Sequence, residues 1–278
     1  MSFSKKTWQG NANTPLNTSS MNDLENRINN AFDAVVNNQL YQGVELNYTW
    51  AQLSSKAKSG DFTGLNVGDY KTITMNGQVV KMQIAGMDTY YKTTDQQLGH
   101  HIDFISKDCF PGTVQWNTTN NNNGNAENAN PYLVSNVYQY LTETLYGYLP
   151  TEVKNVIVEK RMLLEQRYSS SGALTDSTSW AWGSLGKLWL PTEYEVFGSV
   201  VCGTPKWSAG QAVQYPIFAN NWLHRIKGNG NGGSRCNWWL VSVASGDSAV
   251  ACLVGGNGFA DASYTSYSFC VPVCFRLA

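Results

Sequence analysis

Two stretches near the C-terminus decide the fold that the sequence predicts. Residues 228–240 read GNGNGGSRCNWWL, and residues 271–277 read VPVCFRL. Trp238 and Trp239 carry large rings, which we expect to lie buried under a loop and to hold it in one conformation. Val271, Val273, Phe275 and Leu277 alternate along the second stretch, which predicts a strand that closes a sheet with one face in the core.

The residues between these stretches have an unusual composition. Residues 241–270 contain six Ser, four Gly and two Tyr, and they contain no Lys, Arg, Glu, Gln, Met or Trp. Tyr supplies rigid amphipathic contact area and Ser and Gly supply adaptable polar contacts, as in antibody paratopes. The composition favours a recognition surface, and the alternative is a Gly- and Ser-rich loop that covers a core.

Upstream of these stretches, the pattern is that of an α+β domain. Asn76-Gly77 between 70–75 and 78–85 is a strong signal for a β-hairpin, and 101–106 is a candidate strand. Asn130-Pro131 precedes a helical pattern that ends near Gly147, and a second helix is expected from Pro150. Eight of the fourteen residues in 117–130 are Asn, which predicts a surface loop within the domain.

The N-terminal region predicts a separate amphipathic helix over 20–36. Met21, Leu24 and Ile28 begin an apolar series at helical spacing, with Ser20 and Asp23 as a capping box. The apolar stripe of this helix needs a partner. Residues 37–68 give mixed signals and are interpreted as a connector.

Composition excludes several classes of protein. The 278 residues include 19 Lys and Arg and 20 Asp and Glu, so the net charge of −1 provides no basic field for a nucleic acid. No apolar run approaches a membrane span, so no membrane insertion is expected. The first residues lack the apolar stretch of a signal peptide, which predicts synthesis in the cytoplasm.

The search for reactive groups predicts no catalytic residue, metal or cofactor. His100 and His101 would point to opposite faces of a strand and could not share a metal with Asp103. Glu193 and Glu195 would share one face of a presumed strand. Glycosidase chemistry needs two carboxylates that face each other across a cleft, and the sequence cannot place this pair in one. The six cysteines form no CxxC pair, and we interpret them mostly as free thiols that pack as small hydrophobes, with one or two disulfides left open.

The first residues carry two short motifs, Trp8-Gln9-Gly10 and Thr14-Pro15-Leu16-Asn17, before the helix with Leu24, Glu25 and Ile28. With these motifs, residues 8–28 resemble the N-terminal segment of bacteriophage tail and receptor-binding proteins. It implies attachment to a tail or baseplate protein through residues 1–40. Tail fibres are commonly trimers, so the helix is expected to support a homotrimer.

The C-terminal part is similar to the variable region of diversity-generating retroelement target proteins. The similarity is carried by 228–235, by Trp238-Trp239-Leu240 and by 271–277, with 99–104 and 130–132 in support. It implies a C-type lectin-like fold related to the formylglycine-generating-enzyme branch. In such systems AAC codons of the gene are changed to any NNC codon. NNC codons cannot encode Lys, Glu, Gln, Met or Trp, and residues 241–270 contain none of these five amino acids.

The resemblance implies a diversified ligand-binding face within residues 236–270 and a fixed scaffold around it. The family often has Arg where Val241 stands, so this position is expected to vary. The candidate ligand-binding residues are Cys236, Asn237, Val241, Ala244, Asp247, Ala249, Gly255, Asn257, Phe259, Asp261, Tyr264, Tyr267, Phe269 and Cys270. The candidate scaffold residues are Arg235, Trp238, Trp239 and Leu240.

The combined interpretation has three segments: 1–40 for attachment and oligomerisation, 41–66 as a connector, and 67–278 as a lectin-like binding domain. The expected function is that of a phage or prophage tail-tip receptor-binding protein, located in the virion, which binds a host cell-surface protein or glycan. Two alternatives stay open: a formylglycine-generating-type or glycan-cleaving tail enzyme, and a bacterial surface-displayed binding protein. The first needs a reactive Cys pair, and Cys270 and Cys274 on one strand would lie about 13 Å apart, too far for a disulfide.

Overall fold

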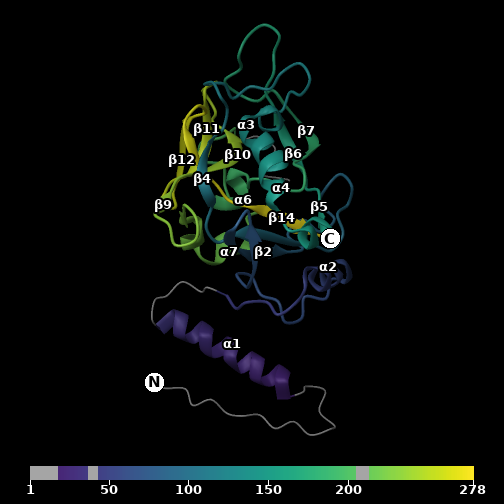
Figure 1. Cartoon of the computed structure of the whole chain (residues 1–278). Coiled ribbons are helices and arrows are strands. Elements are labelled where there is room, and N and C mark those ends of the chain that lie inside the picture. The colour runs from purple at the N-terminus through teal and green to yellow at the C-terminus, as the bar shows by residue number, and fades with distance from the viewer. Residues whose placement is uncertain (1–17, 37–42, 205–212) are drawn as a thin grey trace. The chain divides into compact units, whose positions relative to one another are not determined.

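The computed structural model describes residues 18–36, 43–204 and 213–278, with the side chains of 18, 20 and 30–36 left aside. The chain divides into two compact units, 1–42 and 43–278, each of which is described by itself (Figure 1). The tail-like motif at residues 8–17 lies outside the described residues. Among the described residues, no helix has both the length and the apolar character that a membrane span needs.

The first unit contains one long helix, α1 (Thr18–Val36), as the apolar spacing predicts. The helix begins at Thr18, so Ser20 lies inside the first turn and the predicted capping box at Ser20 and Asp23 is wrong. Asp23 instead accepts a hydrogen bond from Arg27 one turn later, at 2.9 Å. Leu24 and Ile28 are more than half exposed, so these two residues of the apolar stripe are unburied.

The second unit is a mixed α+β domain with mostly strands and a few short helices. Its first sheet has the order β1-β2-β3-β14-β5 and is antiparallel at each junction. The strands are β1 (Tyr70–Met75), β2 (Gln78–Met87), β3 (Ile102–Ser106), β5 (Ile157–Val158) and β14 (Cys274–Leu277). Asn76 and Gly77 both have positive φ, 47° and 75°, as the predicted two-residue hairpin requires.

The second sheet has the order β12-β11-β10-β13-β4, so that β12 is an edge strand (Figure 1). Its strands are β4 (Phe110–Gln115), β10 (Trp238–Val243), β11 (Val250–Val254), β12 (Ala260–Tyr264) and β13 (Ser268–Val271). Two short hairpins complete the strands: β6 (Arg161–Gln166) with β7 (Ser179–Ser184), and β8 (Lys227–Gly228) with β9 (Arg235–Cys236).

The predicted single strand over 271–277 is wrong, because the chain passes there from one sheet to the other. β13 ends at Val271 in the second sheet and β14 begins at Cys274 in the first. Pro272 has no N–H to donate to a ladder, and Val273 instead pairs with Ser106, whose N–H donates to the Val273 carbonyl at 2.8 Å. All of 270–277 is buried, so the segment joins the two sheets through the core.

Short helices fill the spaces around the sheets. The helical pattern predicted after Asn130-Pro131 is divided in two: a 3-10 turn over Tyr132–Val134 and a longer run over 136–148, separated by Ser135, whose backbone is extended. The middle of the longer run is a π-helix over Tyr140–Leu145. The helices of the domain are α2 (Trp50–Ser59), η1 (Tyr132–Val134), α3 (Asn136–Gln139), η2 (Tyr140–Leu145), α4 (Tyr146–Tyr148), α5 (Thr151–Lys154), α6 (Glu193–Phe197), α7 (Pro216–Asn220) and η4 (Trp222–Arg225).

Residues 43–66, which the sequence analysis assigns to a connector, belong to the folded domain. Thr49 and Gln52 form a capping box at the start of α2, and Gly60 ends the helix with a φ of 70°. Trp50 is 2% exposed and lies edge-on to Phe104 and Phe275 of the first sheet, with ring centroids 5.4 and 5.5 Å away. This helix therefore covers part of the core.

A buried polar network lies between the first sheet and the helices. Arg276 on β14 faces its register partner Asp103 on β3, and two hydrogen bonds of 2.7 Å join the guanidinium to both carboxylate oxygens. Tyr215 donates to the same carboxylate at 3.0 Å and accepts a hydrogen bond from Lys160. Lys160 in turn pairs with Glu195, and all of these side chains are buried.

Acid should destabilise the domain in two stages. Burial, with Lys227 and Lys107 nearby, lowers the pKa of His224 from 6.5 to about 4. Burial alone would raise the pKa of Asp103, but Arg276 and the other cations around it hold that pKa at about 2 instead of 3.8. Both groups bind protons less readily in the folded state than in the unfolded state, so the free energy of unfolding decreases as the pH is lowered. Protonation linked to His224 acts between pH 6.5 and 4, and protonation linked to Asp103 acts between pH 4 and 2.

The shift at His224 corresponds to roughly 3 kcal/mol and the shift at Asp103 to roughly 2 kcal/mol. Urea unfolding at pH 7, 5 and 3, followed by far-UV circular dichroism, measures both stages. His224→Asn should reduce the first stage, to which the buried His101 also contributes because burial lowers its pKa too, and should leave the second. A wild-type free energy of unfolding that is the same at pH 7 and pH 5 would contradict the assignment to His224.

Candidate functional site

Four aromatic side chains stand exposed around the edge strand β12, and we call this set the aromatic edge: Trp222, Phe259, Tyr264 and Tyr267. Their exposed fractions lie between 47% and 62%, which is high for rings of this size. Phe259 stacks on Trp222 with ring centroids 6.1 Å apart, and Tyr264 meets Tyr267 edge-on at 5.7 Å. Phe259 immediately precedes β12 and Tyr264 ends it, so one pair lies at each end of the strand.

A tight turn positions the first pair. Gly258 has a φ of 85°, and a β-carbon on it would come within 3.0 Å of Ile226 and 3.3 Å of Trp222. Glycine is therefore needed both for the backbone conformation and for the close approach of the Trp222 ring. The turn closes with a hydrogen bond of 2.8 Å from the Gly258 N–H to the Gly255 carbonyl.

The Asn-rich loop positions the second pair. Thr265, between the two tyrosines, is fully buried and donates to the Thr119 carbonyl at 2.9 Å, while its hydroxyl accepts from the Asn121 N–H at 3.0 Å. The Asn120 side chain accepts from the Ser266 N–H at 3.2 Å. Residues 119–121 thus hold the turn from within, and the two tyrosine rings project outward.

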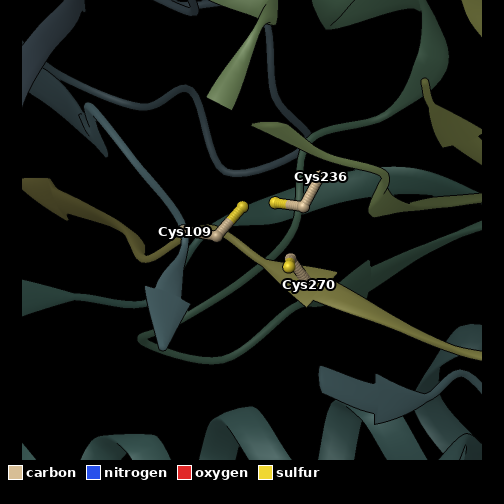
Figure 2. Close-up of side chains that lie close together, drawn as sticks. All are labelled: Cys109, Cys236 and Cys270. Carbon is tan, nitrogen blue, oxygen red and sulfur yellow. The ribbon is translucent and has the colours of Figure 1, made fainter. Parts of the chain in front are cut away.

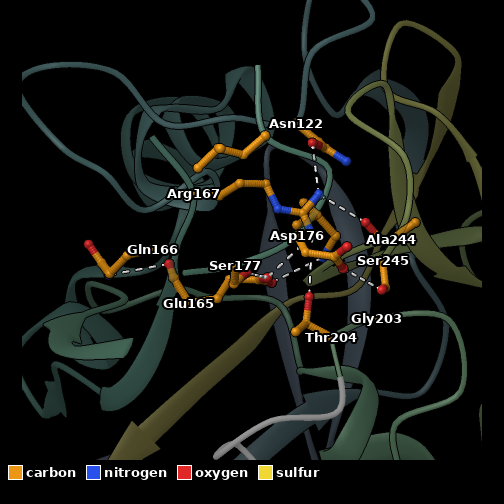
Figure 3. Close-up of polar contacts among 12 residues, drawn as sticks. Asn122, Glu165, Gln166, Arg167, Asp176, Ser177, Gly203, Thr204, Ala244 and Ser245 are labelled. Atoms are coloured by element: carbon orange, nitrogen blue, oxygen red, sulfur yellow. Dashed lines mark hydrogen bonds and ion pairs between the residues drawn. The ribbon is translucent and has the colours of Figure 1, made fainter. Parts of the chain in front are cut away.

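Arg167 ties the same loop to the turn between β10 and β11 (Figure 3). Its buried guanidinium donates to the Asn122 side chain at 3.0 Å, to the Ala244 carbonyl at 2.9 Å and to the Asp247 carbonyl at 3.1 Å. The Asn122 amide donates to the Asp247 and Val250 carbonyls, both at 2.7 Å. The Asn-rich loop is therefore a structural clamp as well as a surface loop.

Acidic and hydroxyl groups surround this clamp. Asp176 pairs with the Ser245 hydroxyl and accepts from the Gly246 N–H at 3.3 Å, while Ser177 donates to Glu165 (Figure 3). Burial raises the pKa of Glu165, and Arg167, whose guanidinium lies 3.8 Å from that carboxylate, opposes the shift. The turn at 244–247 is thus fixed from two sides.

The two central tryptophans form the floor beneath the loops. Trp238 and Trp239 are fully buried, and their indole N–H groups donate to the Arg225 and Val114 carbonyls at 2.8 Å each. Trp239 also packs edge-on against Phe269 at 4.8 Å. Leu240 is buried beside them, whereas Arg235, which the sequence analysis assigns to the scaffold, is exposed on β9.

The structure divides the candidate ligand-binding residues by exposure. The exposed ones are Asp247, Asn257, Phe259, Asp261, Tyr264 and Tyr267, and the half-buried ones are Cys236, Asn237, Ala249 and Phe269. The buried ones are Val241, Ala244, Gly255 and Cys270. These four residues are buried in the sheet and its turns, so none of them offers an exposed side chain to a surface ligand in this conformation.

Sequence reasoning missed two contributors to the site. Trp222 lies outside the 236–270 tract, and only its stacking on Phe259 assigns it to the aromatic edge. Thr265 and the loop residues 119–122 carry no motif for their supporting role. The density of Asn in 117–130 was the available signal, because Asn side chains readily bond to backbone groups in loops.

The other candidate reactive groups have structural partners. His100 contacts Asp88 at 2.6 Å, while His101 is buried and its Nε2 accepts from the Tyr90 N–H at 3.0 Å. Glu193 and Glu195 lie on helix α6, so the predicted strand there is wrong. Glu193 accepts from the Cys202 and Gly203 N–H groups, and Glu195 serves the buried network, so the two carboxylates do not face a common cleft.

The fold and the site together define an α+β domain that displays aromatic side chains around one edge strand. Residues 103–278 match the family described as Domain of unknown function (DUF6273), and the chain belongs to that family. No curated protein and no solved structure matches the chain.

Proposed function

We propose that the chain is a non-enzymatic tail-tip receptor-binding protein of a phage or prophage, and that its aromatic edge binds a host cell-surface protein or glycan. The single observation that carries the proposal is the exposure of four aromatic rings, two of them on a turn that hydrogen bonds of the buried Thr265 side chain hold in place. Rings of this kind supply large contact area at low entropic cost, because their positions are set before the ligand arrives.

The proposal assigns a C-type lectin-like fold to residues 67–278, on the strength of the resemblance around 228–240 and 271–277. The separation of floor and surface supports it. Trp238, Trp239 and Leu240 are buried in the floor, while Asp247, Asn257 and Asp261 project from the turns and from β12. Surface side chains of this kind can change without loss of the core, as a diversified binding face requires.

The attachment part of the proposal rests on α1. Leu24 and Ile28 lie one turn apart and are both exposed, so they can pack against a tail protein or against the same helix of other copies. A homotrimer would present three aromatic edges, and avidity would then compensate for weak single sites.

Binding to intact cells tests the function. The fluorescently labelled full chain is added to a panel of bacterial strains related to the one that carries the gene, and bound protein is measured by flow cytometry. We expect saturable binding to some strains and a loss of about tenfold or more in affinity for the Tyr264→Ala, Tyr267→Ala double variant. Tyr168→Ala, which removes an exposed tyrosine outside the aromatic edge, is the matched control.

Salt dependence adds a second readout. The four rings of the aromatic edge are uncharged, and Asp247 and Asp261 are the only charged residues among the exposed candidates beside them. Raising the salt from about 0.1 M to about 1 M should therefore change the affinity by less than roughly threefold. Absence of binding to every strain, an equal loss in Tyr168→Ala, or a loss of orders of magnitude in salt would overturn the proposed mechanism.

Sequencing of the gene across one phage population tests diversification separately. Variation confined to NNC codons at exposed positions between 236 and 270 is the expected result. A constant sequence there would leave an ordinary binding domain without a diversified face.

A further inference from the structure

Three cysteines from distant parts of the chain converge at the base of the second sheet. Cys109 immediately precedes β4, Cys236 ends β9 and Cys270 lies in β13. Their three sulfur atoms all lie within 4.8 Å of one another, and Figure 2 shows the thiols of Cys109 and Cys236 directed toward each other with Cys270 close by. We call this group the cysteine cluster.

Ordinary packing does not account for the grouping. Cys252 and Cys274 are buried cysteines that behave as small hydrophobes, since burial raises the pKa of each and neither joins a group of thiols in the described part of the chain. The cysteine cluster differs because three thiols from three segments meet at one point. A disulfide would use two of them and leave the third, and all six cysteines are free.

The spacing suits a zinc ion. Zn²⁺ binds thiolate sulfur at about 2.3 Å, so three thiolates on a tetrahedral ion lie about 3.8 Å apart. Sulfur atoms that already lie within 4.8 Å need only small side-chain rotations to reach that separation. Within the described ranges, this is the one grouping of His, Cys, Asp or Glu with metal-ligand spacing.

The electrostatic surroundings favour an anionic complex. Lys227 is paired in register with Cys236 and is 1% exposed, and its ammonium donates to the carbonyls of Ser106 and Lys107. In the described residues no carboxylate lies within ion-pair distance of that ammonium, although Asp108 attracts it from farther away, and a buried cation without a close counter-charge is costly. Three thiolates with one Zn²⁺ carry a charge of −1, which Lys227 balances.

The cluster also has a route for the ion. Cys236 is half-buried and lies two residues after the exposed segment 231–234, while Cys109 borders a pocket with Lys107 and Pro111. The ion can therefore enter from the side of this exposed segment. The three thiol protons would leave with the solvent as the metal binds.

We propose that Cys109, Cys236 and Cys270 bind one Zn²⁺ ion, with water or an external ligand in the fourth position. The ion would tie β9 to β4 and β13 and so secure the glycine-rich hairpin beneath the binding loops. This inference does not depend on the proposed function, because it rests on the cluster and on Lys227 alone.

Metal content of the purified full chain tests the proposal. The protein is kept reduced, loaded with Zn²⁺, desalted and measured by inductively coupled plasma mass spectrometry, and affinity is measured by competition with a zinc-binding dye. We expect one zinc per chain in the wild type and an affinity at least about 100-fold weaker in Cys236→Ser. Cys202→Ser removes a half-buried thiol outside the cluster and should keep one zinc.

Two further measurements guard against misfolding and identify the ligands. Cys236→Ser should keep the wild-type circular dichroism spectrum, and zinc should raise the melting temperature of the wild type but not of this variant. Cobalt in place of zinc should give thiolate-to-metal absorption in the near ultraviolet. A wild type that retains no zinc, equal zinc in Cys236→Ser, or a disulfide between two of the three thiols in freshly isolated protein would overturn the site.

Discussion

Replacing Arg276 with methionine should lower the free energy of unfolding by about 3–5 kcal/mol. The guanidinium and the Asp103 carboxylate are each about 1% exposed, and two hydrogen bonds of 2.7 Å join them across neighbouring strands. Methionine fills much of the space but leaves the Asp103 charge buried without its main partner. Denaturation in urea, followed by far-UV circular dichroism, measures the loss.

The ion pair between Arg161 and Asp95 provides the matched control. It has the same chemistry and a contact of 2.7 Å, but its side chains are 29% and 26% exposed. Arg161→Met should therefore cost less than about 1 kcal/mol. The Asp103→Leu, Arg276→Met double variant should regain part of the loss, because no unpaired charge remains. An equal loss of stability in Arg276→Met and Arg161→Met would show that burial does not determine how much the Arg276–Asp103 pair contributes.

Replacing Trp239 with alanine should cost about 3–5 kcal/mol of stability. The ring is fully buried, packs against Phe269, and donates its indole N–H to the Val114 carbonyl at 2.8 Å. Alanine would leave a cavity under the binding loops and an unpaired carbonyl on β4. Urea denaturation measures the loss, and Trp239→Phe, which keeps a ring but removes the donor, should cost about 1–3 kcal/mol.

Trp222→Ala is the control for the same residue type at the surface. Trp222 is 47% exposed, so its loss should cost less than about 1 kcal/mol of stability. On the proposed function it should instead weaken binding to cells, since Phe259 loses the ring on which it stacks. A large loss of stability in Trp222→Ala would place this side chain in the floor of the domain and remove it from the aromatic edge.

Local patterns predicted the elements whose cause is local. The Asn76-Gly77 hairpin and the helical run over 136–148 follow from turn chemistry and from apolar spacing within a few residues. The prediction at 193–195 was wrong because a local signal was missed: Thr192 and Glu195 form a capping box that starts a helix where alternation predicted a strand. The prediction at 271–277 was wrong for a tertiary reason, because the chain passes there from one sheet to the other.

The candidate site could be predicted only in part from local sequence patterns. The Ser, Gly and Tyr composition of 241–270 marked out the tract that contains Phe259, Tyr264 and Tyr267, but it did not separate them from buried neighbours such as Val241 and Ala244. Burial depends on which turns the Asn-rich loop and Arg167 hold in place. Those contacts join residues that are more than 70 positions apart in the chain.

By itself, the sequence determined the early hairpin, the amphipathic helix α1, the burial of Trp238 and Trp239 and the low charge of the whole chain, because each follows from neighbouring residues or from composition. The tertiary structure alone decided the crossing between the sheets, the pairing of Asp103 with Arg276, the stacking of Trp222 on Phe259 and the cysteine cluster. The physical reason is that each of these brings together side chains from segments far apart in sequence. Their positions depend on long-range packing, which leaves no periodic pattern in the local sequence.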